Sequence, residues 1–112
     1  MALANLSIQS AAAPILTVPA DKTYVITTTI ITNTATPDPL DDTSGETTLT
    51  AHLVSAGGSV GVGNMIINAM PISAGETFVM DSEKIVLDAG DSFQMLSASP
   101  NNLVATLSYV EI

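Results

Sequence analysis

The chain has 112 residues and a formal net charge of −9, from 11 acidic residues against two lysines. That length allows one domain. With 12% charged and 46% hydrophobic residues, the composition argues against charge-driven disorder. It also argues against binding to nucleic acid or to an anionic membrane surface, because both need clustered Lys and Arg.

The first residues lack the features of a targeting segment. They have no basic start, and no apolar run in the chain approaches the roughly 20 residues that span a bilayer. We therefore expect a flexible N-terminal arm over residues 1–14, followed by a single β-sandwich domain over residues 15–112. The chain has no cysteine, which excludes disulfides and thiolate metal sites.

The β-branched residues Thr, Val and Ile make up 33 of the 112 residues, and such side chains favour strands. Turn-forming Gly, Pro and Asp residues recur at short spacing between apolar segments, which is typical of antiparallel sandwiches. In chain order, the expected strands are Ile15–Val18, Thr23–Asn33, Thr47–Ser55, Met65–Ile72, Thr77–Met80, Lys84–Leu87, Ser92–Ala98 and Leu103–Ile112. About eight strands predict an all-β, jelly-roll-like sandwich.

Smaller signals refine this pattern. Pro71 predicts a strand end or a sheet edge, because proline cannot donate to a ladder. A single helical turn is expected at Gly61–Asn64. One pattern of Ala, small or turn residue, charge, hydroxyl and aromatic occurs three times, and it predicts a corner that leads into a strand. The three copies are Ala20–Tyr24, Ala74–Phe78 and Ala89–Phe93.

Strand alternation points to interaction surfaces. If successive side chains alternate between faces, the second face of the long strand and of the last strand consists of Thr, Ser, Val and Ile with hardly any charge. Such a neutral face suits contact with a protein neighbour, although an ordinary Thr-rich solvent face is the alternative. The interface candidates are Val25, Ile31, Val104, Val110 and Ile112.

The residues give little support for catalysis or for a cofactor. His52 is the one histidine, too few for an imidazole metal site, and we expect it on an exposed or neighbour-facing strand surface. No motif positions a serine nucleophile. The acidic residues of the 34–46 segment could bind calcium weakly, but a solvated acidic loop is the simpler interpretation. We therefore expect no catalytic residues, no metal site, no cofactor and no enzyme activity.

Three stretches carry a family resemblance. They are Val18–Ile26 with Ile31–Thr34, then His52–Gly58, and finally Ser73–Phe78 with Ile85–Ser92 and the C-terminal Ser108–Ile112. In these stretches the chain resembles small β-sandwich virion structural proteins of tailed bacteriophages, of the capsid decoration or cement type and the tail accessory type. The resemblance covers about residues 15–112.

The resemblance implies a virion structural protein that works by surface contact, with the capsid exterior favoured as its location. Its partners would be the major capsid protein or other virion proteins, and a homo-oligomer, preferably a trimer, is expected. A neck, tail or fibre component is the first alternative, acting as an adaptor or host-recognition module. A small calcium- or carbohydrate-binding domain is an alternative from another class.

Overall fold

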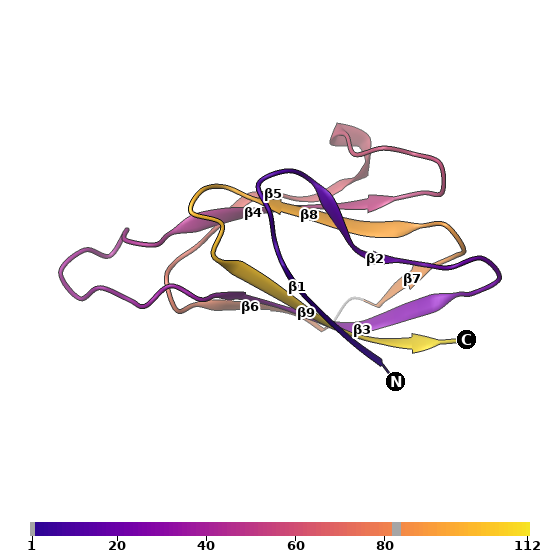
Figure 1. Ribbon diagram of the computed structural model, residues 1–112, viewed down its shortest axis with the longest axis horizontal. Helices are drawn as coiled ribbons and strands as arrows, with labels where there is room; N and C mark the ends of the chain where they lie inside the picture. Colours follow the sequence, from indigo (N-terminus) through magenta and orange to yellow (C-terminus); the bar gives the residue numbers. More distant parts are fainter. Residues whose placement is uncertain (1, 82–83) are drawn as a thin grey trace.

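The computed structural model describes residues 2–81 and 84–112, and over these residues nine strands form two antiparallel sheets stacked face to face (Figure 1). Sheet A has the order β1 (Ala2–Ser7), β9 (Leu103–Glu111), β3 (Tyr24–Asn33) and β6 (Thr77–Met80), with β7 (Ile85–Leu87) also paired to β3. Sheet B has the order β2 (Ala13–Thr17), β8 (Ser92–Ser97), β4 (Thr47–Val54) and β5 (Met65–Ile72). The prediction of an all-β antiparallel sandwich is confirmed.

The strand pairing is that of a jelly roll. β1 pairs with β9, β2 with β8, β3 with β6 and β7, and β4 with β5. These pairs are nested along the chain and alternate between the two sheets, so the chain wraps as one folded ribbon. The expected helical turn is the short 3-10 turn η1 (Val62–Asn64).

The core lies between the two sheets. Its centre is formed by side chains with no solvent exposure, among them Leu49, Phe93 and Leu107. The alternation predicted for the last strand is correct, since Leu103, Ala105 and Leu107 are all buried. With four aromatic residues in the whole chain, this core depends on aliphatic packing.

Strand β3 corrects the predicted alternation. Its register against β9 shifts between Ile26 and Thr28, so Thr27 is an extra residue in a β-bulge. Such a bulge exchanges the faces of every later residue. Ile31 therefore points into the core with 0% exposure, and its place among the interface candidates is wrong.

The flexible arm expected over residues 1–14 is also corrected. Residues 2–7 form β1 against β9, and Pro14 lies within β2; Met1 lies outside the described residues. Ile8, between the two strands, is only 1% exposed, and its N–H donates to the Leu103 carbonyl over 2.9 Å. Without β1, the N–H and C=O groups at this edge of β9 would have no strand to pair with, and residues 2–7 supply their hydrogen-bond partners.

The three predicted corners share one backbone feature. Asp21, Gly75 and Gly90 have φ values of 63°, 78° and 84°, in the left-handed region that tight turns require. At Gly90 a Cβ atom would lie 2.7 Å from the Ala56 Cβ. The repeated pattern thus marks the turns at which the chain reverses between strands.

Both edge strands of sheet B carry a proline. Pro14 lies in β2 and Pro71 in β5, which confirms the edge position predicted for Pro71. Ala69 of β5 has a φ of 50°, and its N–H donates to the Thr50 hydroxyl over 3.1 Å. This part of β5 is irregular against β4, with register shifts on both sides of Ala51.

The burial of Ile8 gives a direct test of the corrected N-terminus. Ile8→Ala is expected to lower the free energy of unfolding by about 2–4 kcal/mol, because it leaves a cavity beside the core. Leu3→Ala, at a side chain that is 70% exposed, should change it by less than about 0.5 kcal/mol. Urea unfolding of both variants measures the difference. Equal effects would mean that residues 2–8 are not docked.

Candidate functional site

The outer surface of sheet A is the strongest candidate site. The residues that point away from the core come from all its strands and align in rows across the sheet, because directly paired residues share a face. They are Leu3, Asn5 and Ser7 of β1, Val104, Thr106, Ser108 and Val110 of β9, Val25, Thr28, Ile30 and Thr32 of β3, Thr77 and Val79 of β6, and Val86 of β7. We call this set the sheet A face. None of its side chains is charged.

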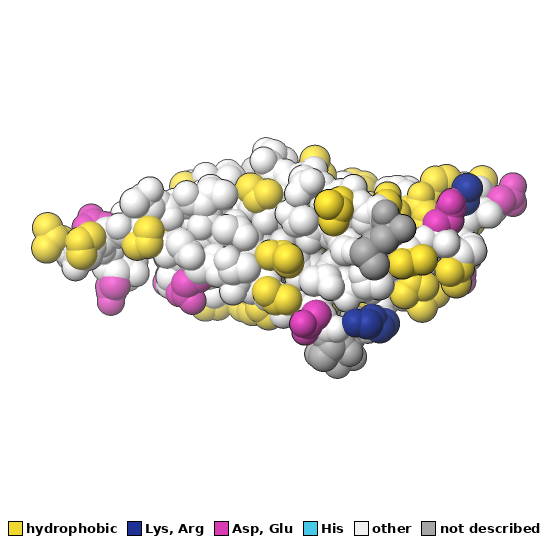
Figure 2. Space-filling model, turned by 90° about the horizontal axis from the view of Figure 1, so that it is seen from below, with side chains coloured by type: hydrophobic (Ala, Val, Ile, Leu, Met, Phe, Trp, Pro, Cys, Tyr) yellow, Lys and Arg dark blue, Asp and Glu magenta, His cyan; other side chains and the backbone are white. Residues whose placement is uncertain are grey.

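Figure 2 views this surface directly. Its middle is a mixture of hydrophobic and uncharged side chains, while acidic side chains lie at the two ends and at one margin. Among the hydrophobic members, Leu3 is 70% exposed, Val86 is 59% exposed and Val79 is 47% exposed. Exposed apolar side chains gathered on one face mark an interaction surface more strongly than scattered ones do.

The polar groups of the sheet A face are partly paired with one another. The Asn5 amide donates to the Thr106 hydroxyl over 2.8 Å, and the Ser108 hydroxyl accepts from the hydroxyl of the bulge residue Thr27, which is outside the set, over 3.2 Å. Polar groups that already have partners lose less when a neighbour displaces water from them. The face can therefore be covered at a lower desolvation cost than its threonine content alone implies.

The five predicted interface residues lie in three different places in the structure. Val25, Val104 and Val110 lie on the sheet A face, with Val25 directly opposite Val110. Ile112 follows the end of β9 and is 74% exposed. Ile31 is in the core.

Several members of the face were missed from the sequence. β1 contributes Leu3 and Asn5, and its alternation of apolar and polar residues could have indicated a strand. Ile30 joins the face because of the bulge, for which the sequence gives no clear signal. Val79 and Val86 lie in expected strands but were not considered as contacts.

Charged groups border the face. At one end, the Lys22 ammonium lies 2.7 Å from the Glu111 carboxylate. The hydrogen bond and the charge of Glu111 raise the pKa of Lys22 above its usual range. At the margin, the Lys84 ammonium donates to the Thr27 carbonyl over 3.2 Å. Both lysines of the chain thus bind to groups of the fold itself.

His52 is expected on an exposed or neighbour-facing strand surface, but it is buried beneath a loop of its own chain. It belongs to the outer face of sheet B, but it is only 4% exposed. Its Nδ1 lies 2.8 Å from the Asn64 Oδ1 at the end of η1, so the 55–64 loop is bound over this part of the sheet. Asn64 also donates to the Ser59 carbonyl and accepts from the Gly61 N–H. These contacts orient the Asn64 amide, with its oxygen towards the His52 Nδ1.

The acidic 34–46 segment is a structured loop. The Asp38 Oδ1 accepts the Leu40 N–H over 2.9 Å. The Asp41 Oδ1 accepts both the hydroxyl and the N–H of Thr43, at 2.8 and 3.1 Å. The described residues contain no group of three or more His, Asp or Glu side chains placed to hold a metal ion. These two carboxylates stabilise turns.

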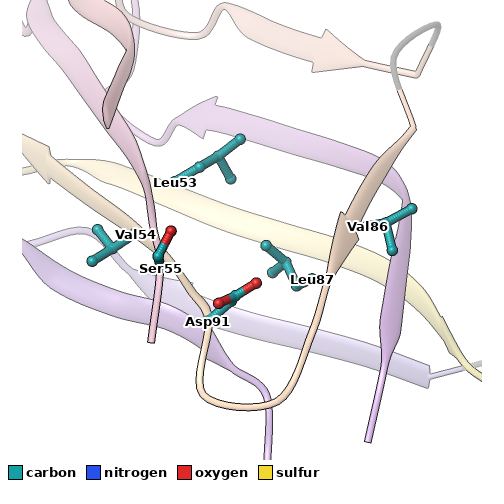
Figure 3. A pocket seen from close by; sticks show the side chains of 6 residues that line it. All are labelled: Leu53, Val54, Ser55, Val86, Leu87 and Asp91. Atoms are coloured by element: carbon teal, nitrogen blue, oxygen red, sulfur yellow. The ribbon is translucent and has the colours of Figure 1, made fainter. Parts of the chain in front are cut away.

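The hollow shown in Figure 3 is lined by both apolar and polar side chains. It measures about 150 Å³, and Leu53, Ser55, Leu87 and Asp91 are among its lining residues. The Asp91 carboxylate already accepts two backbone N–H groups, those of Ala56 and Asp88, each at 3.0 Å. Asp91 therefore stabilises the corner between β7 and β8. The ring of His52 contacts Asn64, so it is not paired with Ser55 of this hollow.

Comparison of the chain with protein-family models, with curated protein sequences and with solved structures finds no match. Within the described part of the chain, no helix is long and apolar enough to cross a membrane.

The Asn64 contacts predict a local effect. Asn64→Ala removes the acceptor of the Gly61 N–H, so hydrogen exchange at the Gly61 amide should accelerate about fivefold, as for a hydrogen bond worth about 1 kcal/mol. Asn68→Ala, at an exposed residue of β5, serves as the control. Amide exchange followed by NMR makes the comparison. Equal rates in both variants would mean that Asn64 does not hold the loop.

The Asp41 contacts predict a pKa change. The hydroxyl and the N–H of Thr43 lower the pKa of Asp41, so the loop gains stability above the ordinary carboxyl pKa and loses it as pH falls through the lowered value. Thr43→Val should raise the pKa of Asp41 towards its usual range. NMR titration of the carboxyl measures this, with Thr36→Val as the control. An unchanged pKa would show that the hydroxyl contributes nothing.

Proposed function

We propose that this protein is a bacteriophage virion structural protein, of the capsid decoration or cement type, that binds the outer capsid lattice through the sheet A face. One observation carries the proposal. The sheet A face extends over all strands of its sheet without a charged side chain, in a chain whose net charge is −9. The uncharged centre and charged rim resemble the anatomy of protein interfaces.

The distribution of acidic groups supports an exterior location. The acidic residues lie in the 34–46 loop, at strand corners and at the end of β9. In a dense array on a shell, these groups would repel neighbouring particles and keep them in solution. Against packaged DNA, the same charge would be unfavourable.

Repetition would make a modest contact sufficient. The major capsid protein would present the same site at every symmetry-related position, so each copy needs only a small contact area to be retained. A trimer of this chain would multiply the contact further. The jelly-roll architecture recurs in viral capsid and lectin domains, which supports the proposal as an analogy of fold.

Mass spectrometry of purified phage particles whose genome encodes this chain tests the proposal. The chain should be present in many copies, and density mapping should place it over the shell. A single ring at the neck or tail would favour the adaptor or host-recognition role. Absence from mature particles would overturn the proposal.

A matched pair of variants tests the binding face. Val104→Lys puts a charge in the sheet A face, and we expect its retention on particles to fall at least about tenfold, because the charge would be buried without a partner. Val62→Lys puts the same charge on the exposed η1 turn, where Val62 is 87% exposed, and should be retained. Both variants should keep the wild-type unfolding midpoint. Equal retention would exclude the sheet A face as the contact.

A further inference from the structure

The loop between β3 and β4 ends in an exposed hydrophobic side chain. Leu40 is 95% exposed, more than any other large hydrophobic residue among those described. The loop forms the end of the molecule opposite the two termini, along a longest dimension of 51 Å (Figure 1). We call residues 38–42 the Leu40 tip.

Hydrogen bonds within the Leu40 tip close a turn. The Asp41 N–H donates to the Asp38 carbonyl over 3.2 Å and closes a turn with Pro39 and Leu40 at its centre. Proline at this position favours the turn. The Asp38 carboxylate also accepts the Leu40 N–H. The Leu40 side chain thus projects from a turn that is closed by two hydrogen bonds to Asp38.

The base of the loop is attached firmly to both sheets. The Asn33 amide donates to the carbonyls of Gly45 and Ile72, each over 2.9 Å, and its oxygen accepts the Ala35 N–H. Asn102 also donates to the Gly45 carbonyl, over 3.0 Å. This network joins the loop to the ends of β3 and β5 and to the residues before β9.

Pro37 packs closely on the next corner. A Cβ atom at Gly75 would lie 2.8 Å from the Pro37 ring, so glycine there permits the contact. A projecting loop with these attachments loses little conformational entropy when it binds. Its exposed leucine contributes no burial to the fold, so its hydrocarbon surface is available to a partner.

We infer that the Leu40 tip is a second contact, in which Leu40 enters an apolar pocket with Lys or Arg at its rim on a neighbouring subunit of the capsid lattice. Asp38, Asp41 and Asp42 surround the leucine in the sequence and are exposed, which matches a basic rim. A second copy of this chain is a poor partner for the acidic Leu40 tip, because that copy also has a net charge of −9 and offers only two lysines for a basic rim.

The direction of the loop supports this occupant. The longest axis runs parallel to the sheet A face, so the loop extends sideways from that face and not away from it (Figures 1 and 2). With the face on one subunit, the Leu40 tip would reach the adjacent one. This inference rests on the proposed function and adds a bridge between subunits.

The test uses particles from a phage lacking the gene, mixed with purified full-length protein and sedimented over a range of salt concentrations. Leu40→Ser should lower the particle affinity at least about tenfold at every salt concentration. The triple variant D38N/D41N/D42N keeps the turn-forming oxygens but removes three charges. It should weaken binding at low salt and flatten the salt dependence.

Val62→Ser is the matched control, since Val62 is also highly exposed, and it should bind like the wild type. Leu40→Ser should keep the wild-type unfolding midpoint. Wild-type binding by Leu40→Ser overturns this inference and leaves the proposed function standing. Failure of the wild-type protein to bind particles overturns both.

Discussion

The pairing of β3 with β9 determines which side chains of sheet A are buried. These two long strands form the centre of the sheet, and every other strand of sheet A pairs with one of them. The bulge at Thr27 divides β3 into two parts with opposite alternation. Without that extra residue, Ile31 would face outward and Ile30 would face the core. The composition of the sheet A face therefore depends on one extra residue, whose hydroxyl donates to Ser108 of β9.

The strands themselves were largely predictable. Met65–Ile72 and Thr77–Met80 have the expected bounds, and the other expected strands differ by one or two residues at one end or, for Ile15–Val18, at both ends. This success has a simple cause: the β-branched segments are separated by residues that permit reversal, such as Asp21 and Gly90, which both take the left-handed conformation. Local chemistry determines these boundaries, so a single sequence is sufficient to find them.

Features that depend on distant contacts were not predictable. The alternation in β1 could have indicated a strand, but the residues 2–7 do not reveal that this strand pairs with β9. His52 follows the expected alternation, yet it is buried because a loop ending at Asn64 folds over it. The outward surface of sheet A was therefore predicted only in part: Val25, Val104 and Val110 point away from the core as the alternation predicted, and Ile31 does not.

The prolines at the two edges of sheet B have a consequence for how copies can associate. An exposed edge strand invites another chain to continue the sheet, which leads to uncontrolled aggregation. Pro14 and Pro71 lack the N–H that such an added strand would use, and the left-handed Ala69 disturbs β5 further. Side-by-side extension of sheet B is thus opposed at both edges. Any association between copies of this chain would therefore have to use the faces or the loops rather than the edges of sheet B.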